Sequence, residues 1–313
     1  MEHMKQKGQQ LALFEGDRSG EERAEGEEGI PAELGAINEL FRRSTLLRST
    51  TAFRELIAFC GRFPHYSIFN CFLVFLQNPR ASLFATATSW QKSCKRTVRP
   101  DARPMIILAP RSPVAFVYDV ADTEGKVLPE QPQDPGAQPG FPPPLPPGVL
   151  QERFHSLQEN GDRYRIHIRR RPRSVLHADG TTRRATEERG RYLLGNPKLI
   201  VEICDQLDLP AGYAALIHEL AHIFLGHLGG DDDGWWPERA QLTRPQSELE
   251  AESVSYLVCR RAGLAHRTTG HLLPHLRDEH ELDAIDLALL LRVASFLEKM
   301  GEKRLPEPGG DRS

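Results

Sequence analysis

The stretch AALIHELAHIFL, residues 214–225, decides how the rest of the chain is interpreted. It places His-Glu-x-x-His in an apolar run without Gly or Pro, which is typical of a buried helix. One helical turn separates His218 from His222, so both imidazoles can bind one Zn²⁺. Glu219, one position further on, can reach a water molecule at the metal. The alternative is a chance pattern, but ionisable side chains in an apolar segment cost free energy unless they bind something.

A second helix with regularly spaced carboxylates is expected over residues 247–259, SELEAESVSYLVC. Glu248 and Glu252 lie one turn apart, so one can be a third metal ligand while the other orients a histidine. The alternative is an acidic helix start that interacts favourably with the helix dipole. Glu250 lies on another face, and we expect it to be exposed to solvent. His227 misses the spacing of a third histidine ligand, so we expect a cap or a surface residue.

His-Glu-x-x-His followed by Glu-x-x-Ala-Glu resembles the gluzincin arrangement. In particular, it is similar to the ImmA/IrrE class of intracellular metallopeptidases and to the C-terminal domain of ArdC-type antirestriction proteins. The resemblance implies that Glu248 is the third Zn²⁺ ligand and that Glu252 orients a histidine ligand. It also implies a zinc metalloendopeptidase in which Glu219 takes a proton from the attacking water. The substrates of such enzymes are specific regulatory proteins, for example repressors.

A second group of motifs lies nearer the N-terminus. It consists of Tyr66-Ser67-x-x-Asn70, Pro79, Trp90, residues 106–110 and Val117-Tyr118-Asp119-Val120-x-Asp122-Thr123. In these motifs, residues 50–125 resemble the single-stranded-DNA-binding domain of ArdC-type proteins. Lys92, Lys95 and Arg96 follow Trp90 closely, and an aromatic ring beside basic residues suits base stacking over a cationic groove. The alternative is that Trp90 belongs to the core.

The hydrophobic pattern predicts an α+β fold with two structured regions. A small α/β domain is expected over 31–128, with helices over 34–41, 53–60 and 66–77 and strands over 105–109 and 114–120. Residues 129–148 are rich in Pro and Gly, which predicts an extended linker. A mostly helical, zincin-like metallopeptidase domain with a small sheet is expected over 149–300, with its last helix over 280–300.

Arginine dominates residues 163–191, which contain ten arginines and only three acidic residues. Residues 163–169 alternate as in a strand, and Asp179-Gly180 predicts a hairpin turn after it. One face of such a hairpin would be cationic and suited to phosphate. The alternative is a solvated hairpin with ion-pair partners elsewhere. A strand is also expected over 198–203, near the motif helix, where an edge strand would suit an extended peptide substrate. Residues 231–233 are expected to form a solvated acidic loop.

Both ends of the chain are expected to be disordered tails, over residues 1–30 and 301–313. The first tail contains the segment Gln10-Leu11-Ala12-Leu13-Phe14. This segment resembles the Gln-Leu-x-Leu-Phe peptide by which bacterial replication and repair proteins dock on the DNA sliding clamp. The apolar anchors would be Leu11, Leu13 and Phe14. The alternative is a chance apolar pentamer.

Composition narrows the location and the partners. No apolar run is long enough to span a bilayer, and the first residues lack the apolar core of a signal peptide. The five cysteines form no Cys-x-x-Cys pair, which suits reduced thiols in the cytoplasm. The net charge of −3 predicts no partner by itself. We therefore expect a cytoplasmic protein without membrane contacts.

Two functions are consistent with these features. The first is an intracellular Zn²⁺-dependent metallopeptidase that cleaves a regulatory protein and carries an accessory DNA-binding domain. The second is a DNA-binding antirestriction or replication-associated protein whose metal site is structural. Single-stranded DNA and the sliding clamp are possible partners under both, and Glu219 distinguishes them because a structural site has no need of a general base.

Overall fold

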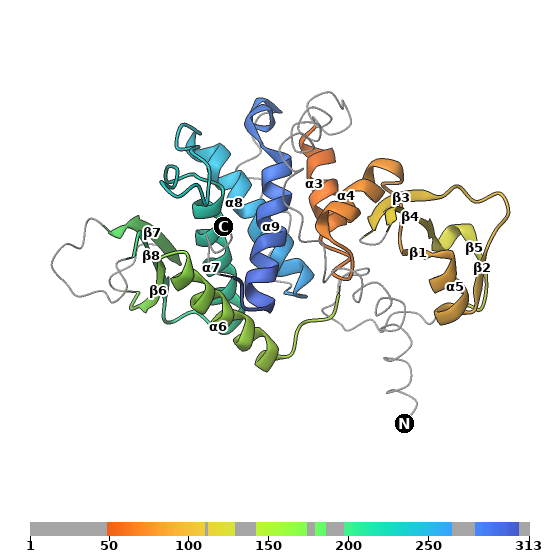
Figure 1. Cartoon of the computed structure of the whole chain (residues 1–313), viewed down its shortest axis with the longest axis horizontal. Helices are drawn as coiled ribbons and strands as arrows, with labels where there is room; N and C mark the ends of the chain where they lie inside the picture. The colour runs from red at the N-terminus through yellow and green to blue at the C-terminus, as the bar shows by residue number, and fades with distance from the viewer. Residues whose placement is uncertain are drawn as a thin grey trace, which may run out of the picture.

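A computed structural model describes residues 49–109, 112–128, 142–173, 179–185, 197–264 and 279–306. Within these ranges the chain has an α+β fold with seven α-helices and three small sheets (Figure 1). The helices are α3 (Thr50–Cys60), α4 (Ile68–Gln77), α5 (Ala87–Cys94), α6 (Pro147–Arg163), α7 (Leu209–Phe224), α8 (Arg244–Arg261) and α9 (Leu287–Glu302). The strands are β1 (Phe84–Thr86), β2 (Arg96–Val98), β3 (Met105–Ala109), β4 (Ser112–Asp119), β5 (Thr123–Gly125), β6 (Ile166–Arg171), β7 (Gly180–Arg184) and β8 (Leu199–Cys204). The predicted fold class is confirmed.

The N-terminal elements follow the expected order. Helices α3 and α4 begin at serine caps, where the side chains of Ser49 and Ser67 accept backbone N–H groups. Strands β3 and β4 pair as predicted, and β1 joins β4 to give the antiparallel order β1-β4-β3. The side chain of Asn70 holds α4 to β3, because it donates to Leu108 O at 3.0 Å and accepts from Leu108 N at 2.9 Å. A second small sheet pairs β2 with β5.

The C-terminal sheet differs from the expected hairpin. Strand β8 lies between β6 and β7, parallel to β6 and antiparallel to β7. The hairpin prediction is therefore wrong: the Asp179-Gly180 turn does not pair the strands on either side of it. The reason is that β8 is fully buried and apolar apart from Glu202, so it takes the central position that an arginine-rich strand cannot fill.

Helices α7, α8 and α9 pack side by side, and α6 connects this bundle to the sheet (Figure 1). Helix α6 was not expected from the sequence. One continuous apolar core runs from α3 and α4 through β8 to α9, while a separate small cluster surrounds Trp90. Within the described ranges, no helix combines the length and apolar composition that crossing a membrane requires.

Several expectations lie outside the described residues. They are the helix over 34–41, the first tail with the clamp-like peptide, the second tail beyond residue 306, most of the Pro-rich linker and the last arginines of the basic segment. These remain predictions. The start of the second tail is described, and there the expected disorder is wrong: α9 extends to Glu302, and Leu305 is buried with its N–H donating to Oδ1 of Asn160 at 2.9 Å.

Arg261, near the C-terminal end of α8, ties the N-terminal helices to the bundle. Its guanidinium is buried and pairs with Glu298 of α9 at 2.6 Å. The same group donates to the carbonyls that end α3 and begin the next turn: Cys60, Phe63, Pro64 and Tyr66, at 2.7–3.3 Å. A single buried cation therefore satisfies four carbonyl groups and one carboxylate.

Replacing Arg261 by methionine should lower the free energy of unfolding by about 3–5 kcal/mol, because Glu298 would be left buried without its partner. Urea denaturation measures the loss. Arg99→Met is the control, since Arg99 is exposed and its contacts with Asp101 and Asp122 are long, at 3.7 Å. Equal, small losses in both variants would contradict a role for Arg261 in joining the two regions.

Candidate metal centre

Helix α7 is buried over most of its length, and the motif residues lie where solvent can reach it. Asp208 caps the helix by accepting from Ala211 N at 2.8 Å, and a proline follows in the first turn. Between residues 212 and 224, every residue is buried except His218, Glu219 and His222. The three polar side chains of the motif therefore share the part of α7 that solvent can reach.

Helix α8 supplies the carboxylate expected from the sequence. A capping box between Thr243 and Gln246 starts the helix, so Glu248 lies in its second turn and faces α7. Its Oε2 lies 3.4 Å from Nε2 of His218 and 3.7 Å from Nε2 of His222. The two imidazole Nε2 atoms are 3.1 Å apart. The predicted ligands are thus brought together by two consecutive helices, α7 and α8.

These distances fit a tetrahedral ion. Ligand atoms about 2.0–2.1 Å from a tetrahedral Zn²⁺ would be about 3.3–3.4 Å from one another. The three observed separations of 3.1, 3.4 and 3.7 Å lie on either side of that value. Among the described residues, His218, His222 and Glu248 form the group of His, Cys, Asp and Glu side chains that could hold a metal ion. Two nitrogens and one carboxylate oxygen suit Zn²⁺ and leave a fourth position free.

Glu219 lies beside this group and against strand β7. The hydroxyl of Thr182 donates to its Oε2 at 2.7 Å. Gly180 is equally close, since a Cβ added there would lie 2.9 Å from Cγ of Glu219 and 3.0 Å from Oε1. A glycine at this position therefore makes room for the carboxylate, and a threonine fixes one of its oxygens.

The surroundings of His218 favour positive charge. Nδ1 of His218 lies 3.1 Å from Oε2 of Glu252, so the predicted orienting carboxylate is in place. Burial opposes protonation of His218, yet hydrogen bonds with Glu248 and Glu252 outweigh it and raise its pKa to about 9. In return, the hydrogen bonds with His218 and His222 lower the pKa of Glu248 far below its usual range. The site attracts cations, whether protons or a metal ion.

The expectations for two neighbouring residues need correction. His227 does take part in the C-terminal cap of α7, through its backbone N–H, but it is not a surface residue: its side chain is 3% exposed, and its Nδ1 lies 2.9 Å from Nδ1 of His222. Glu250 is not exposed either, and its Oε2 lies 2.9 Å from Nε2 of His227. The loop after α7 and Arg239 cover the face of α8 that the helical pattern assigned to solvent.

A sequence signal for His227 does exist. Gly226 has φ of 79°, His227 N donates to His222 O at 3.0 Å and Gly226 N donates to Ile223 O at 2.9 Å. These bonds form a Schellman motif, which brings the second residue after a helix back over its last turn. A glycine directly after the apolar run thus indicates that residue 227 contacts residue 222.

Burial and hydrogen bonding set the charges of this pair. Burial lowers the pKa of His227, which favours the neutral imidazole. Burial alone would raise the pKa of Glu250, but the hydrogen bonds from His227 and Arg239 lower it, so the carboxylate stays ionised.

The residues proposed for DNA binding do not form one exposed group. Trp90 has no exposed surface, and its Nε1 donates to Tyr118 O at 2.9 Å, so a base cannot stack on it in this conformation. Arg96 binds the protein itself, through Thr123 and the Lys126 carbonyl. Lys92 and Lys95 are exposed.

The arginines of β6 and β7 also have an internal partner. Arg169, Arg171 and Arg183 project from one face of the C-terminal sheet and surround Glu202 of β8, with nitrogen–oxygen distances of 2.6–3.5 Å. The expected cationic face is therefore partly neutralised by a buried carboxylate.

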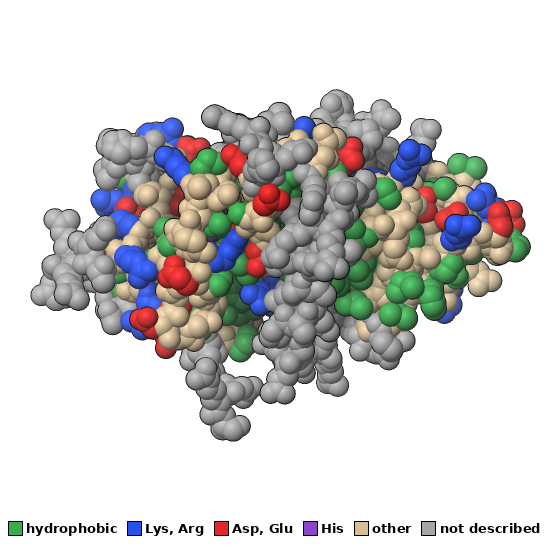
Figure 2. Space-filling model, turned by 90° about the horizontal axis from the view of Figure 1, so that it is seen from above, with side chains coloured by type: hydrophobic (Ala, Val, Ile, Leu, Met, Phe, Trp, Pro, Cys, Tyr) green, Lys and Arg blue, Asp and Glu red, His purple; other side chains and the backbone are tan. Residues whose placement is uncertain are grey.

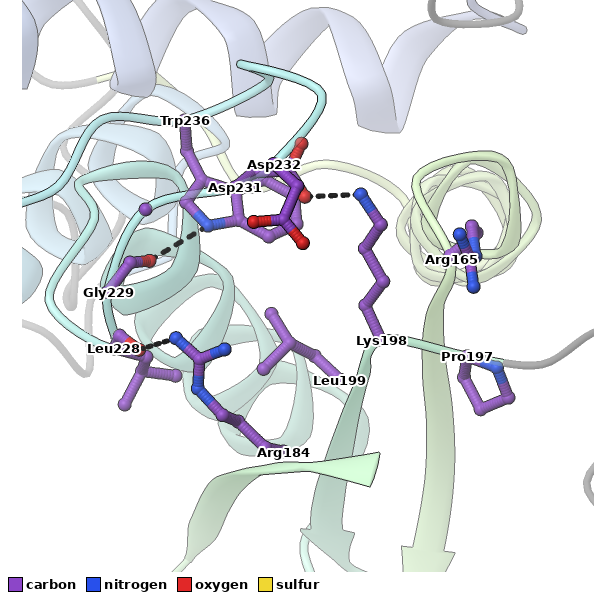
Figure 3. A pocket seen from close by; sticks show the side chains of 11 residues that line it. Arg165, Arg184, Pro197, Lys198, Leu199, Leu228, Gly229, Asp231, Asp232 and Trp236 are labelled. Carbon is purple, nitrogen blue, oxygen red and sulfur yellow. Dashed lines mark hydrogen bonds and ion pairs between the residues drawn. The ribbon is translucent and has the colours of Figure 1, made fainter. Parts of the chain in front are cut away.

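A cavity of about 280 Å³ lies at the ends of β7 and β8, next to the loop after α7 (Figure 3). Arg184 donates to Leu228 O at 2.7 Å on one side, and Lys198 pairs with Asp231 and Asp233 on the other. The Lys198 ammonium also lies 4.2 Å from the centre of the Trp235 ring. The side chain of Asp231 is 1% exposed, so the acidic loop is anchored and not simply solvated, contrary to expectation.

We expect the purified native protein to hold one Zn²⁺ per chain and the variants His222→Ala and Glu248→Ala to lose it, because each removes one of three ligands. Elemental analysis after purification without chelators measures this. Glu219→Gln is the control and should keep the metal, since Glu219 is not among the converging ligands. Metal retained in the alanine variants, or lost in all four proteins, would contradict the ligand set.

Comparison with known proteins leaves the family open. No protein-family model and no curated protein sequence matches the chain. A comparison with solved structures finds the crystal structure of the antirestriction ArdC protein from the R388 plasmid, in a metal-free form. The TM-score is 0.36 with 14% sequence identity, over 76% of this chain and 85% of that chain. A likeness this distant does not establish a shared fold or function, so the site must be interpreted from its own geometry.

Proposed function

We propose that this chain is a zinc-dependent peptidase. His218, His222 and Glu248 hold the ion, and Glu219 is the general base. The observation that supports this most is the combination of a tetrahedral set of ligand atoms with a separate carboxylate, held against strand β7 by Thr182. A bound Zn²⁺ would act as a Lewis acid and bring the pKa of a coordinated water to about 7.

Glu219 is placed to move the proton of the attacking water. The Thr182 hydroxyl donates to Oε2 and so fixes the orientation of the carboxylate that would accept the proton. The same carboxylic acid can then protonate the leaving amine, which completes hydrolysis of a peptide bond. A site that only stabilised the fold would have no use for this second carboxylate beside Glu248.

Strand β7 provides a place for an extended peptide. Ala185 N donates to Lys198 O and Cys204 N donates to Asp179 O, which fixes the alternation of hydrogen bonds between β7 and β8. By that alternation, Gly180, Thr182 and Arg184 direct their backbone N–H and C=O groups away from β8. Among the described strands, β7 lies at the edge of its sheet. A peptide that adds to this edge would run directly past Glu219.

The substrate in this proposal is therefore a segment of protein in extended conformation. A regulatory protein such as a repressor, as the sequence resemblance implies, would meet this requirement if the cleaved segment were unfolded or in a loop. The zinc ion, the peptidase activity and the substrate are all parts of the one proposal.

A second candidate function is binding of single-stranded DNA, with a structural metal site. It is favoured by an exposed apolar face on the β3–β4 pair, where Ile106, Leu108, Val114 and Phe116 are 39–51% exposed. Hydrophobic side chains gather at this end of the molecule (Figure 2). An exposed aromatic ring can stack on a base, and Phe116 offers one where Trp90 does not.

The variant Glu219→Gln separates the two candidates. We expect zinc-loaded native protein to cleave peptides in a proteome-derived mixture, detected as new N-termini by mass spectrometry. Loss of the general base should reduce cleavage by about 10²–10⁴-fold while zinc content is unchanged. Equal cleavage by both proteins, or none by the zinc-loaded native protein, would contradict the peptidase proposal and favour DNA binding.

Gly180→Ala tests the position of Glu219 without touching it. The added methyl group would lie within 3.0 Å of the Glu219 side chain, so the carboxylate must shift. A shift of about 1 Å in a reacting group can cost about 100-fold in rate, and we expect a loss of that order with normal zinc content. Gly148→Ala is the matched control, because an added methyl group there meets nothing within 4 Å. Equal activity of the two variants would show that β7 does not position the base.

A further inference from the structure

The two histidines of the motif are supported in different ways. Nδ1 of His218 faces the carboxylate of Glu252 directly, at 3.1 Å. Nδ1 of His222 faces another imidazole, because Nδ1 of His227 lies 2.9 Å from it. The carboxylate contacts the other ring nitrogen of this second imidazole: Oε2 of Glu250 lies 2.9 Å from Nε2 of His227.

The direction of the hydrogen bonds between His222, His227 and Glu250 follows from the position of His222. Its Nε2 faces the other ligand atoms, at 3.1 Å from His218 and 3.7 Å from Glu248. A neutral imidazole that offers the lone pair of Nε2 to a metal carries its proton on Nδ1. The Nδ1–H group of His222 must therefore donate, and Nδ1 of His227 must accept. That leaves the proton of His227 on Nε2, where it donates to Glu250.

Glu250, the last residue in this series of hydrogen bonds, can only be an acceptor. Arg239 donates to both oxygens of Glu250, at 2.6 and 2.7 Å, and the backbone N–H of Asp286 donates to Oε1 at 2.9 Å. Glu250 has no exposed surface, so no solvent competes for these oxygens. A carboxylate surrounded by donors can only accept from His227. A series of hydrogen bonds that runs from Glu250 through His227 to His222 is therefore excluded.

The backbone holds His227 in place independently of its side chain. Gly226 has φ of 79°, and a Cβ there would lie 2.1 Å from the carbonyl oxygen of Pro237. The turn thus requires glycine, and it places the N–H of His227 3.0 Å from the carbonyl of His222. Both the main chain and the imidazole of His227 are therefore directed at the same residue.

We infer that His227 is a positioning residue for His222. Its two ring nitrogens link the proposed metal ligand His222 to the buried carboxylate of Glu250. This inference rests on the proposed metal site. His227 selects the Nδ1–H tautomer of His222 and fixes the plane of its ring, as Glu252 does for His218. Partners of this kind usually change metal affinity by about 10–100-fold when they are removed.

The first test compares zinc affinity in competition with a chromophoric chelator. His227→Leu removes the acceptor, and we expect binding about 10–100-fold weaker than native. His227→Asn keeps an oxygen near the place of Nδ1, and we expect it to recover most of the affinity. His155→Leu is the matched control, since that side chain is 67% exposed on α6, and native affinity is expected.

The second measurement needs no variant. Long-range ¹H–¹⁵N spectra of zinc-loaded native protein should show His222 protonated on Nδ1 and His227 protonated on Nε2. His227 protonated on Nδ1 would overturn the inference, because two N–H groups would then face each other. Native affinity in His227→Leu, or equal losses in the Leu and Asn variants, would also overturn it while the metal site stands. If the native protein binds no zinc, both the site and the inference fall.

Discussion

The structure depends on the burial of two carboxylates of α8: Glu252 against α7, and Glu250 against the loop that follows α7. Glu250 and Glu252 are almost fully buried, and an ionised carboxylate without partners in such a place costs several kcal/mol. Each is compensated by a different group: Glu250 by Arg239 and His227, and Glu252 by His218. These contacts stabilise the packing of α8 that also brings Glu248 to the imidazoles. Stability of the bundle and formation of the metal centre are consequences of the same contacts.

This packing extends beyond the helices that carry the site. Arg261 lies at the other end of α8, where it pairs with Glu298 and satisfies the carbonyls after α3. The apolar core is continuous from α3 to α9. A change in the position of the N-terminal helices would thus act on α8 directly, and through it on the residues that face the metal site. The proposed peptidase site and the N-terminal region are therefore connected through α8.

Helical spacing predicted which residues share a face of one helix: His218 with His222, and Glu248 with Glu252. The family resemblance, not the spacing, assigned Glu248 as the third ligand, and neither predicted the other residues that surround the site. The contact between Glu250 and His227 depends on a loop that returns over α8, and the period of a helix contains no information about that loop. The prediction of the strand order was wrong for a similar reason, since β6 pairs with β8, which follows β7 in sequence, and not with β7 itself. Glu202 gave no local sign that three arginines would surround it.

Thr182 joins two parts of the proposed reaction that could otherwise vary independently. Its hydroxyl holds Glu219, and its backbone N–H and C=O point to the open side of β7. A peptide paired with those groups would stiffen the strand at the residue that positions the base. Binding of an extended substrate and placement of the proton acceptor would then be coupled. A folded helix or a compact loop could not make the same backbone contacts, so under this proposal the edge would select for substrates in extended conformation.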